Sequence, residues 1–445
     1  MKEKLTYSEY AVIASMLFGM FFGAGNLIFP VYMGQAAGSE MWAAVAGFLI
    51  TGVGIPLLAV AALGMSHSNG LMDLSSKVGR KYGLFFTCLL YLAIGPFFAV
   101  PRCASVPFTV AIQSLLPESA ELMVPQLAFT FAFFAVALAL SLKPGKIMTW
   151  IGKILNPVFL LSLGVLLLKA MISPMGAVHE IVPDASYAGK AFFTGFLEGY
   201  NTLDALAGLA FGIVVINVVK GLGVERAEAV AKNTVLAGVF SCVLMGVIYL
   251  AVTLMGARSR GVLPLYSNGG EALAAIADYY YGSVGGLILA AIVTFACLKT
   301  AVGLLTSCSE TFVGLFPKGP SYRIWCVIFS VFSFVVSNVG LTAIIAYAIP
   351  ALMFLYPLAI TLILLSLCDN WFGGSREVYV SVTACTFAAA LLDLIKALPG
   401  QLGMTGLLSF ASAHLPLFDL GLGWICPALV GLVVGLIWKA GSRKK

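Results

Sequence analysis

The segment EGYNTLD at 198–204 places four polar side chains inside a long apolar stretch of the chain. Glu198 and Asp204 are carboxylates, and Asn201 and Thr202 lie between them. If the stretch crosses a membrane, such groups are costly in lipid and must face a cavity or polar partners. The segment therefore indicates a binding site at membrane depth. A network of hydrogen bonds between helices, with no ligand, is the structural alternative.

A second candidate lies near the N-terminus, where Gly23 and Gly25 flank one small residue in the segment GMFFGAGN at 19–26. Two glycines so close together weaken a helix and free backbone N–H groups. A half-helix that begins there points its positive end into the membrane, which suits a carboxylate. Glycines also allow helices to pack closely, so this pair alone is a weak signal.

The composition shows which kind of protein carries these two segments. The chain has 445 residues and a mass of 46.9 kDa, is 61% hydrophobic and only 10% charged, and has a mean hydropathy of +1.03. Soluble domains carry roughly 25% charged residues, so a soluble globular enzyme and a disordered chain are both excluded. Apolar runs of about 20 residues indicate helices in a lipid bilayer and not a membrane barrel. The net charge of +6 does not indicate a nucleic-acid partner.

The cysteines and histidines predict no cofactor and no metal cluster. The nine cysteines lie in or beside apolar runs and form no CxxC pair, so we interpret them as small core residues. His67, His179 and His414 are far apart in the sequence, and no HExxH spacing occurs.

About twelve membrane-spanning segments are predicted, so the expected fold is an all-α polytopic membrane protein. The third, sixth and eighth segments are long, and we expect them to be tilted or broken, with Gly95-Pro96 as a kink in the third. The segments lie near 11–35, 41–65, 83–114, 122–142, 150–172, 188–219, 229–256, 284–316, 323–338, 341–366, 378–398 and 421–440.

Lysine and arginine set the predicted orientation, because they collect in short loops on the cytoplasmic side. With the N-terminus inside, 18 of the 25 basic residues lie at inner ends of the segments. Both termini are therefore expected in the cytoplasm. The five outer basic residues are Lys169, Lys190, Arg258, Arg260 and Lys396, and the two inside the membrane are Arg102 and Lys299.

The longest loops, near 173–187 and 257–283, are both on the predicted outer side. The second contains EALAAIADYYYG, an apolar helical stretch too short to span. It is either a re-entrant or surface helix that could act as a lid, or a plain amphipathic loop helix. The outer segment 399–420 is similar. We expect Asp393 at the membrane surface, and Arg102 either beside an acid such as Glu198 or Asp204 or extended toward the surface.

The two interrupted segments are the first and the sixth, five spans apart. An odd offset means that the second half of the chain is inverted relative to the first. Interrupted helices at corresponding places in inverted halves are typical of secondary transporters. A membrane enzyme with Asp204 and Asp393 as a catalytic pair, or a channel, is the alternative, but neither acid lies in a motif for such chemistry. No GxxxxGK[ST] motif, which would bind ATP, is present to power transport in another way.

Four segments carry a family resemblance: FFGAGNLIFP (21–30), GPFFAVPR (95–102), EGYNTLDALAGLAFG (198–212) and ACLKTAVGLLTSCSETF (296–312). In order and position they resemble the bacterial branched-chain amino acid:cation symporters, the LIVCS or BrnQ-type carriers. The resemblance implies a single membrane transport domain over 1–445 with the leucine-transporter (LeuT) fold. Two inverted five-helix repeats are expected at 11–172 and 188–366, with two additional helices at 378–440. It also implies symport of leucine, isoleucine or valine with Na⁺ or H⁺ across the bacterial cytoplasmic membrane, and no enzymatic activity.

The same resemblance implies two groups of site residues. Backbone around Gly23-Ala24-Gly25 is expected to hold the substrate carboxylate, with apolar side chains as a wall. The cation site is expected between the first and eighth spans. The substrate-binding residues would be Phe21, Phe22, Gly23, Ala24, Gly25, Asn26, Glu198, Gly199, Tyr200, Asn201 and Thr202, and the cation-site residues Gly19, Phe22, Ala296, Lys299 and Thr300.

Lys299 departs from the pattern of the family, in which a hydroxyl is common at this place. A charged ammonium has no lone pair to offer Na⁺. Its ammonium could fill the site itself, bonded to the carbonyls of Gly19, Phe22 and Ala296 and the hydroxyl of Thr300. Reversible protonation would then couple transport to protons. The alternative is that Lys299 extends to the inner surface and sodium binds elsewhere.

Overall fold

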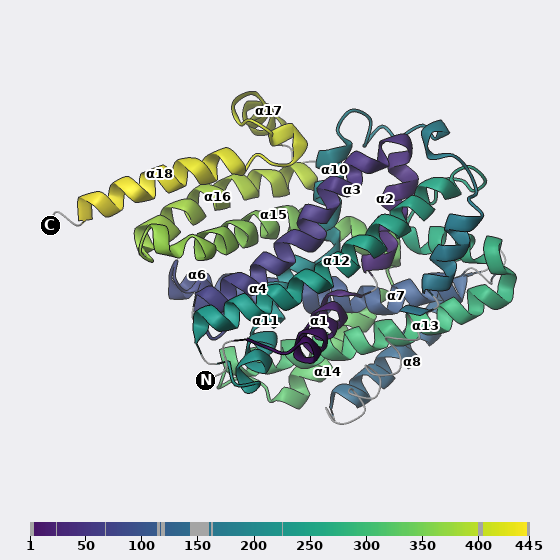
Figure 1. Cartoon of the computed structure of the whole chain (residues 1–445), viewed down its shortest axis with the longest axis horizontal. Helices are drawn as coiled ribbons and strands as arrows, with labels where there is room; N and C mark the ends of the chain where they lie inside the picture. The colour runs from purple at the N-terminus through teal and green to yellow at the C-terminus, as the bar shows by residue number, and fades with distance from the viewer. Residues whose placement is uncertain are drawn as a thin grey trace.

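A computed structural model describes residues 4–23, 25–66, 68–113, 116, 121–142, 160–161, 163–224, 226–398 and 404–442. Every regular element in these ranges is a helix, and the helices pack side by side in one body (Figure 1). The prediction of an all-α protein is therefore confirmed. Nine of the described helices are long and apolar enough to cross a membrane, and two shorter apolar helices lie at 163–172 and 322–337. The expected number of twelve spans remains a prediction.

The first predicted span is two helices, α1 (Tyr7–Phe21) and α2 (Gly25–Ala37). Thr6 and Glu9 form a reciprocal capping box at the start of α1. The sixth is also divided, into α10 (Ala191–Glu198), η6 (Gly199–Thr202) and α11 (Asp204–Gly221). Both interruptions fall in the segments that the sequence singled out.

The other described helices follow the predicted spans closely, and residues 150–159 of the predicted fifth span lie outside the described residues. The third span bends at Gly95, whose backbone is non-helical, as the Gly95-Pro96 pair predicted. The remaining elements are η1 (Gly38–Glu40), α3 (Met41–Leu49), η2 (Ile50–Gly54), α4 (Ile55–Met65), α5 (Leu71–Ser75), α6 (Arg80–Leu92), η3 (Ala93–Phe97), α7 (Ala99–Ala111), α8 (Met123–Ser141), η5 (Val178–Glu180), α12 (Ala227–Ser259), α13 (Gly269–Leu315), α14 (Tyr322–Ser337), α15 (Leu341–Leu367), η7 (Asp369–Trp371), α16 (Arg376–Ala397), α17 (Thr405–His414), η9 (Phe418–Leu420) and α18 (Ile425–Ser442).

Glycines bring the interrupted helices against their neighbours. An added Cβ at Gly34 of α2 would lie 2.1 Å from a backbone oxygen of α12, and one at Gly256 of α12 would lie 2.2 Å from a backbone oxygen of α2. An added Cβ at Gly47 of α3 would likewise lie 2.0 Å from a backbone oxygen of α10, and one at Gly195 of α10 would lie 2.0 Å from a backbone oxygen of α3. Small residues permit this approach in lipid, where helix association depends on close packing.

The predicted outer helix at 271–282 exists as the first part of α13. Gly282 has φ +62° and ψ −168°, a conformation open to glycine, and here the helix changes direction before it continues as the eighth span. Asn268 caps this first part, and its amide also donates to Thr342 Oγ1 over 3.1 Å. An added Cβ at Gly269 would meet the Ile28 carbonyl, so the helix lies directly on α2.

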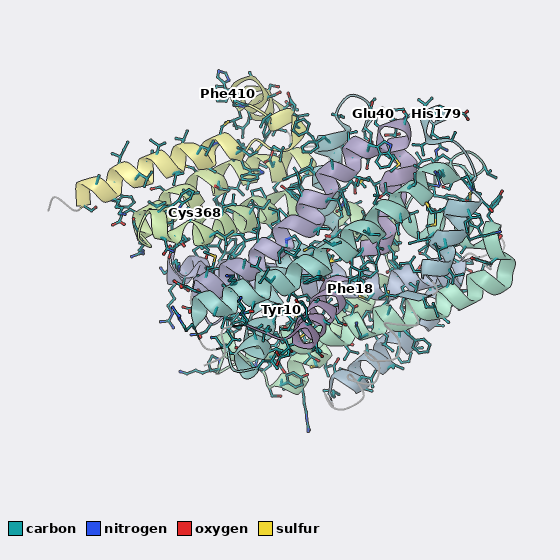
Figure 2. All side chains as sticks on the ribbon, in the orientation of Figure 1. Tyr10, Phe18, Glu40, His179, Cys368 and Phe410 are labelled. Carbon is teal, nitrogen blue, oxygen red and sulfur yellow. The ribbon has the colours of Figure 1, made fainter. Side chains whose placement is uncertain are left out.

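The labelled side chains in Figure 2 show where the predicted outer loops lie. Glu40, His179 and Phe410 come from three loops assigned to the same side, and they appear along one edge of the molecule. Asp184 N–H donates to the Ala36 carbonyl over 2.8 Å, which ties the loop before α10 to the end of α2. The side-chain and backbone donors of Ser186 lower the pKa of the Asp184 carboxyl, so this exposed loop carries a fixed negative charge.

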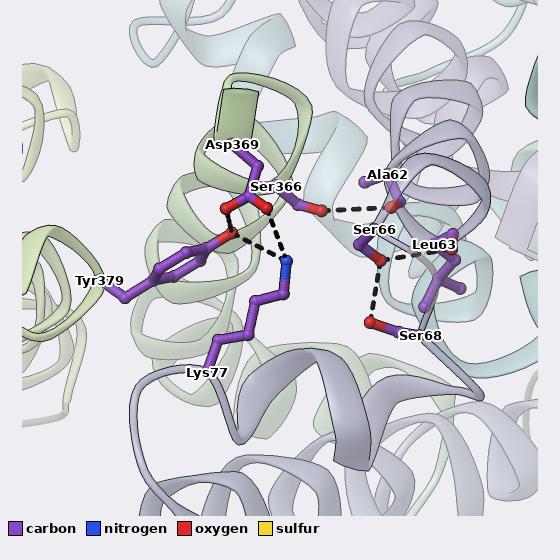
Figure 3. Close-up of polar contacts among 8 residues, drawn as sticks. All are labelled: Ala62, Leu63, Ser66, Ser68, Lys77, Ser366, Asp369 and Tyr379. Atoms are coloured by element: carbon purple, nitrogen blue, oxygen red, sulfur yellow. Dashed lines mark hydrogen bonds and ion pairs between the residues drawn. The ribbon is translucent and has the colours of Figure 1, made fainter. Parts of the chain in front are cut away.

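Near the predicted inner ends of α4 and α15, a polar cluster joins the segments that follow them (Figure 3). Lys77 Nζ lies 3.1 Å from Asp369 Oδ2, and the Tyr379 hydroxyl donates to Asp369 Oδ1 over 2.8 Å. Deeper in the molecule, the Ser366 hydroxyl donates to the Ala62 carbonyl over 3.1 Å. We call Lys77, Asp369 and Tyr379 the inner clasp. Beside it, the C-terminal helix α16 packs on α15, and α18 packs on the other side of α16 (Figure 1).

Candidate functional site

At the first interruption, the side chain of Asn26 accepts a hydrogen bond that a backbone carbonyl would accept in a continuous helix. The Phe22 N–H still donates to the Phe18 carbonyl over 2.8 Å, as in a helix. The next donor, Gly23 N–H, goes instead to Asn26 Oδ1 over 2.7 Å. In a continuous helix it would have gone to the Gly19 carbonyl, so that acceptor is released. Ala24, the middle of the predicted glycine turn, lies outside the described residues.

The second interruption depends on Leu203, which has φ +64°. A left-handed conformation is uncommon for a leucine and costs energy. This conformation separates η6 from α11. Thr202 lies between the two helices, and its hydroxyl donates to the Gly199 carbonyl over 2.9 Å. The Asp204 N–H donates back to Thr202 Oγ1 over 3.3 Å. The carboxylate of Asp204 thus stands in the first turn of α11, where the helix dipole favours negative charge.

The two interruptions face each other. Asn26 Nδ2 donates to Asp204 Oδ2 over 2.6 Å, which joins the start of α2 to the start of α11. An added Cβ at Gly25 would lie 3.7 Å from the Asn201 carbonyl oxygen. The structure therefore brings together the glycine segment and the polar segment, which are about 180 residues apart. This contact places the predicted substrate residues around one point.

Tyr249 of α12 completes this joint, and sequence reasoning missed it. Its hydroxyl donates to Asp204 Oδ2 over 3.1 Å and contacts the Asn26 amide. Its ring meets Phe48 edge-on at 5.2 Å and stacks near Phe22 at 6.2 Å. A lone tyrosine in an apolar span carries no local signal, so its role appears only when α12 is placed against α2.

The side chain of Arg102 in α7 contacts the polar segment at a backbone carbonyl and not at an acidic side chain. Its Nη1 donates to the Asn201 carbonyl over 2.7 Å, and its guanidinium lies 5.2 Å from the Phe29 ring centre. Asn201 in turn donates to Glu198 Oε2 over 3.0 Å. Arg102 is buried and does not extend to the surface. The sequence suggested a direct ion pair with an acid, and the structure instead uses the guanidinium to hold the carbonyl end of η6.

Aromatic side chains form apolar walls beside the interruptions. Tyr200 is buried and stacks on Tyr356 of α15 with ring centres 4.0 Å apart. Phe22 is buried as well and stacks on Phe18 at 4.8 Å, and Phe21 is buried in the same core. The surroundings thus combine backbone groups released from regular helix, two acidic side chains and flat apolar surface.

The predicted cation residues also come together. Lys299 Nζ lies 3.4 Å from the Gly19 carbonyl, the acceptor released by the interruption of α1. The Thr300 hydroxyl donates to the Ala296 carbonyl over 3.1 Å, and its methyl group would lie 3.5 Å from an added Cβ at Gly23. The ammonium therefore points toward the C-terminal end of α1, which attracts positive charge. It does not turn away to the surface.

Acidic, cysteine and histidine side chains form no metal site in the part of the chain that the structure describes. What the site offers is a pair of helix ends of opposite polarity, a fixed ammonium and a hydrogen-bonded carboxylate. Such a site can hold the two charged ends of a small zwitterion.

Solved structures share this architecture at low sequence identity. The inward-facing conformation of Mhp1 matches with a TM-score of 0.63 at 13% identity, over 99% of this chain and 95% of that one. A closed conformation of Mhp1, a nucleobase-cation-symport-1 family transporter with bromovinylhydantoin bound, matches with a TM-score of 0.60 at 13% identity over the same shares. The match shows the fold, and it confirms the predicted LeuT-like architecture.

Relatives with assigned names are much closer in sequence. The branched-chain amino acid permease BrnQ of Lactobacillus delbrueckii subsp. lactis is 50% identical over 445 residues, covering all of both chains. BrnQ of Bacillus subtilis is 42% identical over 98% of both chains, and BrnQ of Escherichia coli K12 is 36% identical over 100% of this chain and 99% of its own. The family described as "Branched-chain amino acid transport protein" matches residues 6–442. The chain is thus a multi-pass membrane transporter and not an enzyme, and it belongs to the branched-chain amino acid transport protein family.

Proposed function

We propose that the protein imports leucine, isoleucine and valine across the bacterial cytoplasmic membrane by alternating access, driven by a cation gradient. The observation that carries this proposal is the contact between the two interrupted helices, with Asn26 bonded to Asp204. Interrupted helices at mid-membrane form the substrate sites of secondary transporters. The names of the relatives give the substrate class.

The proposed site binds the two charged ends of an amino acid at different helix ends. The carboxylate lies at the N-terminus of α2, against backbone at Gly23, Ala24 and Gly25, since the backbone N–H groups of a helix N-terminus and the positive end of its dipole attract an anion. The ammonium lies on the carbonyl side, at η6 and Glu198. The apolar side chain of the substrate packs against the aromatic walls. These walls contain no charged group that could pair with the side chain of a basic or acidic amino acid. Asn26, Gly199, Asn201 and Thr202 shape the two interruptions, and Phe21, Phe22 and Tyr200 form the walls.

We propose two inverted repeats at 11–172 and 188–366, with α1–α2 and α10–α11 as equivalent units, and additional helices at 378–440. Both termini are cytoplasmic. In this arrangement the first part of α13 covers the beginning of α2, beside the interruption, as a lid, supported by its contact with Ile28.

The proposed cation is built into the chain. Two carboxylates, Glu198 and Asp204, and two basic groups, Arg102 and Lys299, lie around the interruptions, so their charges balance without a bound ion. The Lys299 ammonium takes the place of Na⁺ and holds α1 against α13 through the Gly19 carbonyl. An ammonium and a sodium ion carry the same charge, so one excludes the other. Transport is then driven by protons and does not need sodium at this site.

Uptake of radiolabelled leucine into proteoliposomes tests the function. We expect concentrative uptake that excess isoleucine or valine suppresses and that lysine or glutamate does not. Only a secondary transporter with an apolar pocket gives both results. Equal competition by lysine would contradict the pocket, and the absence of concentrative uptake under any ion gradient would contradict the transport mechanism.

A further inference from the structure

Asp393 lies in α16, outside the ten proposed core helices, and it is buried. The sequence placed it at the depth of the membrane surface, which stays a prediction, and the structure adds that it lies inside the protein, with only 1% of the residue exposed. Neither carboxyl oxygen has a hydrogen-bond partner in the described part of the chain. A bare buried carboxylate is costly, so a group in this position is expected to bind a proton, a cation or water.

Lys396, one turn further along α16, does not neutralise Asp393 by contact. Its Nζ donates to the Phe418 carbonyl over 2.8 Å and lies 3.6 Å from Asp419 Oδ1. It also lies 4.6 Å from the centre of the Phe418 ring. The ammonium acts on Asp393 only through space. Because the Lys396 ammonium is bonded to Phe418 and lies near Asp419, it leaves the Asp393 carboxyl available for a proton.

A hydroxyl donor lies near Asp393. The Asp393 charge acts on Tyr200 of η6, and the Trp424 indole N–H lies beside the Tyr200 hydroxyl. Neither Tyr200 Oη nor Trp424 Nε1 has a partner of full hydrogen-bond geometry among the described residues. A donor beside a carboxyl group disfavours a metal cation there, because a donor and a cation compete for the same oxygen. Tyr356 of α15, stacked on Tyr200, is the remaining ionisable group beside this cluster.

The C-terminal segment also touches the interrupted sixth span directly. An added Cβ at Gly421, in the loop before α18, would lie 2.7 Å from the Leu197 side chain of α10. Leu197 comes three residues before Tyr200. A movement of η6 therefore changes both the packing of this loop and the distance between the Tyr200 hydroxyl and Asp393.

We propose that Asp393 is a proton-binding site whose affinity depends on the position of Tyr200. With the hydroxyl away, as here, the carboxyl keeps its O–H bond, since an ionised form would have no donor. When η6 moves the hydroxyl onto the carboxyl, the carboxylate is stabilised, the O–H bond breaks and the proton passes to water. Binding and release then follow the state of the substrate site. This inference rests on the proposed function for its coupling, but not for the presence of the proton.

Infrared spectroscopy of the purified full-length protein tests the proton without any transport. A pH titration should remove a C=O band of a protonated carboxyl in the wild type, and Asp393→Asn should lack this component. Asp369→Asn, a change in the inner clasp, is the matched control and should retain it. An identical set of carboxyl bands in wild type and Asp393→Asn would overturn the proposal, whether or not the protein transports leucine.

Leucine uptake at varied external pH tests the coupling. Above its midpoint the wild-type rate should fall about tenfold per pH unit, as for one titrating group. Asp393→Asn should show a flat profile, and Asp393→Glu should keep a pH dependence with a shifted midpoint, which separates titration from misfolding. Asp369→Asn, the same control in the inner clasp, should retain the wild-type slope. The wild-type slope in Asp393→Asn would overturn the assignment.

Discussion

At the scale of single residues, the site depends on a joint of three side chains, Asn26, Asp204 and Tyr249. Asn26 both caps the interruption of α1 and donates to Asp204. A carboxylate buried in a membrane protein needs such donors, because its loss of hydration is otherwise not offset. The joint therefore holds the relative position of α2, α11 and α12.

Replacement of Tyr249 by Phe removes one donor to a buried carboxylate while the ring contacts remain. We expect the free energy of unfolding to fall by roughly 1.5–3 kcal/mol and leucine uptake per folded molecule to drop severalfold. Tyr322→Phe is the matched control, because Tyr322 donates to the Ser141 carbonyl away from the site. Thermal unfolding and uptake should be measured on both. Equal uptake in the two variants would remove Tyr249 from the site.

Replacement of Gly25 by Val tests the close approach of substrate and backbone at the first interruption. An added Cβ lies 3.2 Å from the Phe29 ring and faces Asn201, so a branched side chain fills the space between the interruptions. Uptake should fall below detection while the amount of protein in the membrane stays normal. Gly406→Val in α17, where an added Cβ meets nothing within 4 Å, is the control. Normal uptake by Gly25→Val would show that the substrate binds elsewhere.

Local chemistry explains which of these residues the sequence could predict. Glycine pairs and buried acids are unusual in apolar runs, so Gly23, Gly25, Glu198 and Asp204 were recognisable. Tyr249 was not, because its partner Asn26 is 223 residues away and a single aromatic in a span is ordinary. The burial of Asp393 was not predictable for the same reason: a place near a helix end does not show which neighbours cover a side chain, and α16 packs against α15 and α18.

At the scale of elements, the lid depends on one backbone conformation. Gly282 has φ +62°, and any side chain there is strained. Gly282→Ala should lower the free energy of unfolding by about 1–3 kcal/mol and reduce uptake, because the first part of α13 would leave α2. Gly286→Ala in the same helix, with open space and an ordinary backbone, should leave both unchanged. Similar melting temperatures for the two variants would show that the bend is not needed.

The inner clasp joins the segment after α4 to the segment after α15. Lys77 and Asp369 are each about a quarter exposed, so their attraction is only partly screened. Asp369→Asn should loosen this end and speed thiol labelling of Cys368 in a variant that keeps only this cysteine. Asp419→Asn, on an outer loop, should not. Unchanged labelling would mean that the clasp does not hold these helices together.

At the scale of the whole molecule, the span positions, the bend at Gly95 and the all-helical fold followed from hydropathy and glycine or proline placement. Which helix packs on which could not be predicted, because an apolar span has no polar face to indicate its neighbour. Only the fit between side chains decides the partners. The interruptions were the exception: the family resemblance assigned both to one substrate site, and in the structure Asn26 is bonded to Asp204.

The ion dependence of leucine uptake by wild type and Lys299→Thr tests the central claim most directly, that a lysine stands in the place of sodium. Sodium and proton gradients are imposed separately on proteoliposomes. The wild type should concentrate leucine in sodium-free medium under an inward proton gradient, and Lys299→Thr, which regains a hydroxyl beside Gly19, should respond to sodium. Strict sodium dependence of the wild type, with Lys299→Ala still concentrating leucine, would contradict the account.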